Sequence, residues 1–191
     1  MNNQTPDNTS QSYLQKDTPP AGTPKKPVTS KGQLLLCLLV TVGLIIMDQI
    51  TKIIAAETLA DGRSITLIKG VLEFTFVQNR GAAFGILQNA LPFFIIITLA
   101  ALSAIIYILI RIPADRRYLP MRAALCFIAA GAVGNFIDRL LLSYVRDFIY
   151  FSLIDFPVFN VADIYITCAT FFLMFMALFY YKEDEDFAFL K

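Results

Sequence analysis

Four long apolar segments constrain the fold of this chain more than any other feature of its sequence. They lie at residues 33–54, 91–110, 123–142 and 161–181. Each is close to the roughly 20 residues that an α-helix needs to cross a bilayer. Because 57% of the 191 residues are hydrophobic, a soluble domain of this size would be unable to bury them all. The sequence therefore predicts an all-α membrane protein with four transmembrane helices.

The first apolar segment also fits the hydrophobic core of a cleavable signal peptide, which is the competing interpretation. No strict Ala-x-Ala cleavage site follows it, and apolar character continues through Ile54. The longer segment has the length of a span. We therefore expect the first transmembrane helix over 33–54, with the polar residues Asp48 and Lys52 toward its far end.

The chain ends are polar and differ in composition from the spans. Residues 1–32 are rich in Asn, Gln, Ser, Thr, Pro and Lys. Such a segment buries too little apolar surface to offset its ordering entropy. We expect a disordered tail over 1–32, one membrane domain over 33–182 and a short acidic tail over 183–191.

The connection at 57–89 has the pattern of a small β element. Gly62 and Gly70 mark turns. Apolar and polar side chains alternate over 72–76, which is the period of a half-buried strand. We therefore expect a β-hairpin or cradle over about 57–89 at the membrane surface. We interpret the connection at 143–160, which contains aromatic and aliphatic residues, as a loop lying in the interface.

The charges of the connections predict the orientation of the chain. The N-terminal tail carries four Lys residues, and the connector 111–122 carries four Arg residues against one Asp. Positively charged segments next to spans stay on the cytoplasmic side. An even number of spans brings the C-terminus to the same side, so both termini are expected in the cytoplasm and the β element on the outer side.

With this topology, the polar residues in or near the spans gather in one layer at the outer interface. They are Asp48, Lys52, Asn79, Arg80, Asn135, Asp138, Arg139, Asp147, Asn160 and Asp163. Ionisable groups at membrane depth are costly and mark a functional site by default. A transporter would need polar residues through the inner halves of the spans, which are almost purely apolar. A scaffolding protein would leave the clustered aspartates unexplained.

The residue types in this layer favour one kind of hydrolytic chemistry. The chain has no His, which excludes Ser-His, Cys-His and His-metal sites. Cys37, Cys126 and Cys168 lie in apolar runs without metal spacing, where a free Cys behaves as a small hydrophobe. Two carboxylates in an apolar setting cannot both ionise easily, so one becomes an acid and the other a base that activates water, as in aspartic proteases. The net charge of +1 argues against a nucleic-acid partner.

Most of the individual pairs also have a purely structural interpretation. These interpretations are an interfacial ion pair for Asp48–Lys52, a helix cap for Asn160–Asp163 and a link between helix and loop for Asp138–Arg139. A structural interpretation is harder to give for Asp147, because apolar residues flank it and no helix begins nearby.

Five motifs in this layer closely resemble those of the lipoprotein signal peptidases, the signal peptidase II family of bacteria. The motifs are Asp48-Gln-Ile-Thr-Lys52, Asn79-Arg-Gly-Ala-Ala-Phe84, Gly131-Ala-Val-Gly-Asn-Phe-Ile-Asp-Arg139, Val145-Arg-Asp-Phe148 and Phe159-Asn-Val-Ala-Asp163. The resemblance covers roughly 33–181, and the order and spacing of the motifs make it specific. The two tails lie outside it.

The resemblance implies an aspartyl endopeptidase in the bacterial cytoplasmic (inner) membrane, with its site near the outer leaflet and the β element as a cradle for the substrate on the outer (periplasmic) side. Such enzymes remove the signal peptide of prolipoproteins just before the diacylglyceryl-modified cysteine. By motif, the catalytic pair would be Asp147 and Asp163. The residues that bind substrate or support the pair would be Asp48, Lys52, Asn79, Gly81, Asn135, Asp138, Arg139 and Asn160. The partners would be prolipoproteins and membrane lipid.

The expected mechanism needs no metal or other cofactor. One Asp deprotonates a water molecule and the other protonates the scissile carbonyl. As an alternative, Asp147, Asp163 and Asn160 carry the oxygen ligands that a hard cation such as Mg²⁺ prefers.

Overall fold

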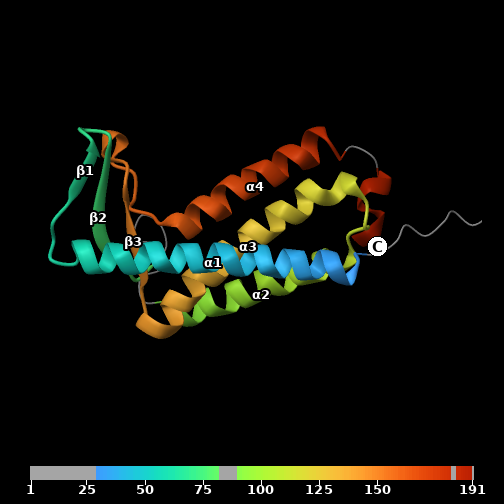
Figure 1. The fold of residues 1–191 in the computed structure, drawn as a ribbon, viewed down its shortest axis with the longest axis horizontal. Helices are drawn as coiled ribbons and strands as arrows, with labels where there is room; N and C mark the ends of the chain where they lie inside the picture. Colours follow the sequence, from blue (N-terminus) through green and yellow to red (C-terminus); the bar gives the residue numbers. More distant parts are fainter. Residues whose placement is uncertain (1–28, 82–89, 182–183, 191) are drawn as a thin grey trace, which may run out of the picture.

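The computed structural model of the chain describes residues 29–81, 90–181 and 184–190. In this part of the chain, four helices are long and apolar enough to cross a membrane. They are α1 (Lys31–Leu59), α2 (Leu91–Arg111), α3 (Leu119–Leu142) and α4 (Val161–Phe179). Figure 1 shows them packed lengthwise, with a small sheet at one end of the bundle. The predicted fold class, four membrane helices with a small β element, is confirmed.

Helix α1 is longer than the predicted span 33–54 at both ends. Ser30 caps its start, because the Ser30 side chain accepts a hydrogen bond from the Gln33 N–H. Its last turns contain Ala55 and Leu59, which are buried in a cluster with residues of the sheet. Residues 57–59, expected in the β element, are therefore helical because packing against the sheet stabilises the extra turns.

Three other helix boundaries also differ from the prediction, and the smallest difference is in α2, which ends at Arg111 instead of 110. Helix α3 begins at Leu119, four residues before the expected start at 123, with Pro120 in its first turn, where a proline costs little. Helix α4 begins at Val161 as expected but ends at Phe179 instead of 181.

The sheet has the antiparallel order β1 (Ile65–Ile68), β2 (Leu72–Asn79) and β3 (Val145–Tyr150) in the described residues. The first two strands form the expected hairpin. Strand β3 corrects the prediction of an interfacial loop over 143–160. Its partner β2 lies about seventy residues earlier in the chain, and the pairing sets Asp147 opposite Val77 and Val145 opposite Asn79. The rest of the predicted β element, 82–89, lies outside the described residues.

Helix α3 lies at the centre of the bundle and contacts α1, α2 and α4. Two glycines permit its close packing. A Cβ on Gly131 would meet the Ala162 carbonyl oxygen and the Ile166 side chain, and a Cβ on Gly134 would meet Asp48 Oδ2. Large apolar side chains face outward on the other helices, for example Leu39 and Phe171, as expected of surfaces in contact with lipid.

The end of the bundle away from the sheet is closed by the C-terminal segment. The short helix η5 (Asp184–Leu190) brings Asp186 to Arg117, with a distance of 2.8 Å from Nε to Oδ1. Tyr118 stacks on Tyr181. The predicted acidic tail is thus folded against the bundle over the residues described. The predicted N-terminal tail lies outside the described residues up to 28, and its last two residues begin helix α1.

Candidate active site

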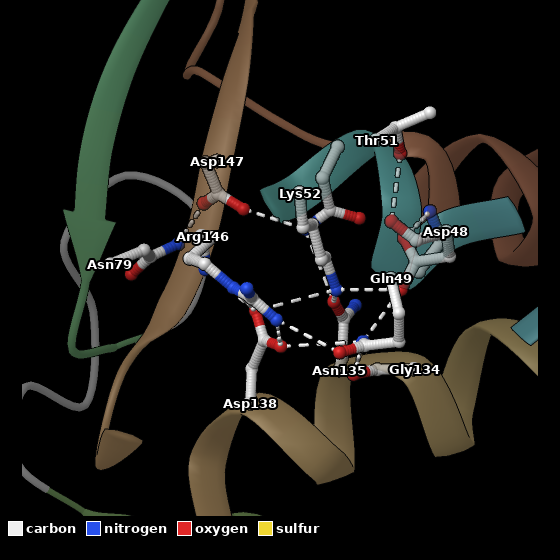
Figure 2. Close-up of polar contacts among 12 residues, drawn as sticks. Asp48, Gln49, Thr51, Lys52, Asn79, Gly134, Asn135, Asp138, Arg146 and Asp147 are labelled. Atoms are coloured by element: carbon white, nitrogen blue, oxygen red, sulfur yellow. Dashed lines mark hydrogen bonds and ion pairs between the residues drawn. The ribbon is translucent and has the colours of Figure 1, made fainter. Parts of the chain in front are cut away.

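The predicted site residues come together where the sheet meets the helices. They are contributed by α1 (Asp48, Lys52), β2 and the residues after it (Asn79, Gly81), α3 (Asn135, Asp138, Arg139), β3 (Asp147) and the start of α4 (Asn160, Asp163). Figure 2 shows the part of this group around Lys52 and Asn135. The topology brings five separate stretches of the sequence to one polar cluster between apolar helices.

Asp147 is buried on strand β3 and accepts a hydrogen bond at each carboxylate oxygen. Asn79 Nδ2 donates to its Oδ2 at 2.8 Å, and Asn160 Nδ2 donates to its Oδ1 at 2.6 Å. Burial, with the nearby charge of Asp163 as the second cause, raises the pKa of Asp147 to about 7 in spite of these hydrogen bonds. The carboxyl group therefore gains or loses its proton near neutral pH.

Asp163 lies in the first turn of α4 and also has a donor at each oxygen. Asn135 Nδ2 donates to Oδ1 at 2.8 Å, and the Asn160 backbone N–H donates to Oδ2 at 3.1 Å. In return, the Asp163 N–H donates to Asn160 Oδ1 at 3.0 Å. Asn160 and Asp163 therefore form the helix cap that their sequence positions also suggested. It also leaves the Asn160 amide nitrogen free to serve Asp147.

Three asparagine side chains direct their amide nitrogens at the two carboxyl groups, and each is oriented by a donor at its oxygen. Asn79 Oδ1 accepts from the Gly81 N–H at 2.9 Å. Asn135 Oδ1 accepts from Lys52 Nζ at 2.9 Å and from Asn160 Nδ2 at 3.1 Å. Because the oxygens are occupied, the NH₂ groups are the ends that remain to face the carboxyl groups.

A buried group of alternating charges lies behind these asparagines. Lys52 Nζ is 2.9 Å from Asp48 Oδ2 and 3.6 Å from Asp138 Oδ2, and all three side chains are completely buried. Asp48 Oδ1 also accepts from the Ala162 N–H at 3.0 Å, which satisfies a free donor in the first turn of α4. Asp48 and Lys52 therefore form the ion pair considered from the sequence, but the pair is buried instead of lying at the interface. Through Asp48 it also links α1 to α4.

Sequence reasoning missed two members of this group, Arg146 and Gln49. Arg146 Nη2 lies 2.6 Å from Asp138 Oδ1 and donates to Gln49 Oε1 at 2.8 Å. Asp138 was expected to act with the adjacent Arg139, but its arginine partner is Arg146. The one available signal was that Arg146 immediately precedes Asp147.

Arg139 is turned away from Asp138 and toward α2. Its guanidinium lies 4.4 Å from the centre of the Phe94 ring, and its Nη2 donates to the Gly81 carbonyl at 3.4 Å. Stacking on an aromatic ring favours this position of the cation. Both Arg139 and Gly81 line the same cavity as the carboxyl groups.

A cavity of about 410 Å³ contains both Asp147 and Asp163 in its wall. Polar residues from other elements also line it, namely Asn79, Asn135 and Arg139. The mainly apolar part of the wall comes from the segment before α4 and from one side of α4 itself: Phe156, Pro157, Val158, Phe159, Ile164, Thr167 and Cys168. Cys168, interpreted from the sequence as a small hydrophobe in an apolar run, is exposed in this wall. A mainly apolar cavity with a few polar groups suits a ligand that has apolar groups and a polar group for the cavity to orient.

The hydrogen-bond donors around the two carboxyl groups can be compared with what the alternative, a hard cation held by Asp147, Asp163 and Asn160, would require. The Asn160 side chain presents nitrogen, not oxygen, to Asp147, while all four oxygens of the two carboxyl groups accept N–H donors. Within the described ranges, no group of three or more acidic, Cys or His side chains is arranged to hold a metal ion. The residues present are oriented for hydrogen bonding to the carboxyl groups rather than for coordination of a cation.

Comparison with known proteins gives consistent similarities over most of the chain. The sequence model of a family described as "Signal peptidase (SPase) II" matches residues 40–179. The lipoprotein signal peptidase of Clostridium novyi is 38% identical over 144 residues, which are 74% of this chain and 94% of the relative. That of Brevibacillus brevis is 46% identical over 129 residues, which are 68% of this chain and 85% of the relative.

Solved structures match the fold as well. A bacterial membrane enzyme determined by the in meso method at 2.3 Å resolution is 37% identical, with a TM-score of 0.71 over 84% of this chain and 97% of that one. A second structure of a bacterial membrane enzyme, at 1.9 Å resolution, is also 37% identical, with a TM-score of 0.69 over 83% and 99% of the two chains.

Proposed function

This chain belongs to the signal peptidase II family, and on that premise we propose that it is an aspartyl endopeptidase of prolipoproteins. It removes the signal peptide by cutting just before the diacylglyceryl-modified cysteine. The observation that carries the proposal is that Asp147 and Asp163 share one cavity, with every carboxylate oxygen held by an N–H donor. Such a preorganised pair is suited to a single shared proton.

The two carboxyl groups have different roles in the proposed reaction. Because the pKa of Asp147 is about 7, Asp147 carries the shared proton at neutral pH. Asp163 takes a proton from the attacking water, whose oxygen bonds to the scissile carbonyl carbon, while Asp147 gives its proton to the carbonyl oxygen. Asp163 then passes its proton to the leaving nitrogen as the C–N bond breaks. Asp147 recovers a proton from the intermediate, so the pair again holds one.

The asparagines and the buried charges support this chemistry without taking part in it. Asn79, Asn135 and Asn160 keep the carboxyl groups in place, so little reorganisation is needed when charge moves between them. Lys52 and Asp48 hold Asn135 and the start of α4. The family motifs imply that these residues bind substrate or support the catalytic pair. They imply the same for Gly81, Asp138 and Arg139.

The proposed setting is the bacterial inner membrane, where the chain is a multi-pass protein. The four-Arg connector and helix η5 lie at the end of the bundle away from the sheet. The positive-inside rule assigns that end to the cytoplasm. Both termini are then cytoplasmic, and the cavity faces the outer leaflet, where a lipid-modified substrate enters from membrane lipid. A nucleic-acid partner is not part of the proposal.

The test is cleavage of a diacylglyceryl-modified prolipoprotein by the purified protein in lipid or detergent, with mass spectrometry of both products. We expect release of the intact signal peptide and a new N-terminal modified cysteine, and no cleavage of the unmodified precursor. Asp147→Asn and Asp163→Asn should each abolish turnover, and the double variant should be little worse than either, because the pair acts as a unit.

The matched control is Asp61→Asn, which alters an exposed aspartate paired with Arg63 in the connection between α1 and β1. It should cleave like the unaltered protein. The proposed mechanism is wrong if Asp147→Asn or Asp163→Asn, folded and monodisperse, retains substantial turnover. Absence of cleavage by the unaltered protein would contradict the proposed activity itself.

A further inference from the structure

Arg146 occupies a central place beside the proposed catalytic pair, although it touches neither carboxyl group. It lies on β3 one residue before Asp147, and its side chain is only 12% exposed. Three of its nitrogens reach Asp138: the backbone N–H at 2.9 Å, Nε at 3.2 Å and Nη2 at 2.6 Å. The strand is therefore fixed to α3 at the residue that precedes Asp147.

The buried charges around Arg146 balance. Asp48 and Asp138 are two buried carboxylates, and Lys52 and Arg146 are the two cations that contact them. Arg146 uses both oxygens of Asp138. This occupancy leaves the Lys52 ammonium closer to Asp48 than to Asp138, and in hydrogen-bond contact with Asn135 Oδ1. Figure 2 shows Arg146 and Lys52 approaching Asp138 from different elements.

We propose that Arg146 is a positioning residue for the catalytic pair, acting on Asp147 through the strand and on Asp163 through Lys52 and Asn135. The inference rests on the proposed function and names a further residue required for it. The first route is the three-donor contact with Asp138, which fixes the backbone next to Asp147. The second route runs from Lys52 Nζ to Asn135 Oδ1 and from Asn135 Nδ2 to Asp163 Oδ1.

Loss of Arg146 would disturb both routes for an electrostatic reason. Asp138 would keep Lys52 as its remaining cation within contact distance, because its Arg139 neighbour is directed toward Phe94. A buried carboxylate that has lost one partner attracts the other more strongly. Movement of Lys52 toward Asp138 would draw the ammonium from Asn135 Oδ1 and release the orientation of the amide that faces Asp163.

The fork of the arginine side chain matters as well as its charge. Nε and Nη2 each meet a different oxygen of Asp138, and Nη2 also reaches Gln49 Oε1 on α1. A lysine at the same position would supply the charge at one point only. Arg146→Lys should therefore preserve the electrostatic balance and lose part of the geometry, while Arg146→Gln loses both.

The experiment measures kcat and KM between pH 5 and pH 9 for the full-length protein and its Arg146→Gln, Arg146→Lys and Arg63→Gln variants. Arg63 is an exposed arginine in an ion pair and serves as the matched control. We expect Arg146→Gln to lower kcat by about 10- to 100-fold with KM changed little, since small misplacements of reacting groups cost on that order. Arg146→Lys should fall between, and Arg63→Gln should match the unaltered protein.

The pH profile separates positioning from a merely structural role. The cations that act on the pair are Lys52 on α1 and Arg139 on α3, and Asp48, Asp138 and Arg146 form the ion-pair group around Lys52. Removing the positive charge of Arg146 from this set makes the shared proton harder to release. The fall of kcat at high pH should move to higher pH in Arg146→Gln and stay in place in Arg146→Lys, which keeps the charge.

Two results would overturn the inference. One is an unaltered protein that cleaves and an Arg146→Gln variant with the same kcat and pH profile. The other is a loss confined to folded yield, with normal kcat per folded molecule. If Arg146→Gln does not fold, Arg146→Lys decides: reduced kcat at unchanged KM supports positioning, and unchanged kcat contradicts it. Failure of the unaltered protein to cleave would instead count against the proposed function.

Discussion

Lys52 donates a hydrogen bond of 2.9 Å to Asn135 Oδ1, and this contact determines which end of the Asn135 amide faces Asp163. An ammonium group in the middle of a buried charge cluster thus controls a hydrogen bond to a proposed catalytic carboxyl group. Buried ion pairs contribute little net stability, because desolvation offsets their attraction. We therefore interpret the cluster as a set of contacts that fixes one arrangement of α1, α3, α4 and β3 around the cavity.

The first prediction concerns Asp138, which holds this cluster together without lining the cavity. Asp138→Asn leaves Lys52 and Arg146 short of a counter-charge in a buried site. Breaking a buried pair in this way costs about 3–5 kcal/mol. We expect a clearly lower unfolding temperature and reduced folded yield, with measurable turnover in the protein that folds, because Asp147 and Asp163 remain. A well-folded but inactive Asp138→Asn variant would assign Asp138 to the reaction instead.

The second prediction concerns Gly134, which lies directly against Asp48. A Cβ at this position would overlap Asp48 Oδ2, so Gly134→Ala must displace the carboxylate from Lys52 and from the Ala162 N–H. Overpacking of this kind costs about 1–3 kcal/mol. We expect thermal unfolding at lower temperature together with weaker cleavage, both measured on the same purified sample.

The control for this substitution is Gly43→Ala in α1, where the described residues place no atom beyond the helix's own backbone within 4 Å of the new Cβ. Alanine is favoured over glycine inside a helix by roughly 0.5–1 kcal/mol. Gly43→Ala should therefore unfold at the same or a slightly higher temperature and cleave normally. Equal effects of the two substitutions would show that the contact between Gly134 and Asp48 is unimportant.

The third prediction uses Cys168, an exposed thiol in the cavity wall. A bulky maleimide attached there would occupy space beside Ile164 and Thr167 on the same side of α4. We expect alkylation to block cleavage and prior occupation of the cavity by substrate to slow the alkylation. Cys168→Ser should retain activity after treatment with the reagent, because Cys126 is buried and the half-buried Cys37 does not line the cavity. Full activity after complete modification of Cys168 would mean that substrate does not use this wall.

Much of the fold could be predicted from the sequence because each span carries its own apolar signal. The charge of the connections then placed Asp48, Asn79, Asp138, Asp147 and Asp163 in one layer, and in the structure hydrogen bonds and ion pairs through Lys52, Asn135 and Asn160 join them in one cluster. Their assignment to catalysis or support remains a prediction. This layer could be predicted because the up-and-down topology alone brings the C-terminal ends of α1 and α3 and the N-terminal ends of α2 and α4 to the same side.

The remaining features depend on contacts between distant segments. Strand β3 has buried positions at Val145, Asp147 and Phe148, which do not alternate cleanly, and its partner strand precedes two of the helices. The pairing of Arg146 with Asp138 follows from that strand, so it was equally hidden. The extension of α1 to Leu59 depends on packing against Phe148. None of these contacts has a local pattern that would identify it.

The fourth prediction follows from the pKa of Asp147, which burial and Asp163 raise to about 7. An aspartate in an unfolded chain has a pKa of about 3.9. Between these values, the folded protein holds a proton that the unfolded chain has released, so its stability falls as the pH rises through this window. Asn at position 147 cannot titrate. The unfolding temperature of Asp147→Asn, relative to the unaltered protein, should therefore increase from pH 4.5 to pH 7 and remain level above it.

The same proton should govern catalysis. Because Asp147 must be protonated to act as the acid, kcat of the unaltered protein should decline as the pH rises through about 7. Asp61→Asn is the control: the exposed Asp61 has its pKa lowered by Arg63, so its substitution should change neither the high-pH decline of kcat nor the trend in unfolding temperature above pH 5. A constant difference in unfolding temperature between Asp147→Asn and the unaltered protein across pH 4.5–8.5 would show that Asp147 titrates like an ordinary aspartate. In that case another group must supply the proton to the carbonyl oxygen.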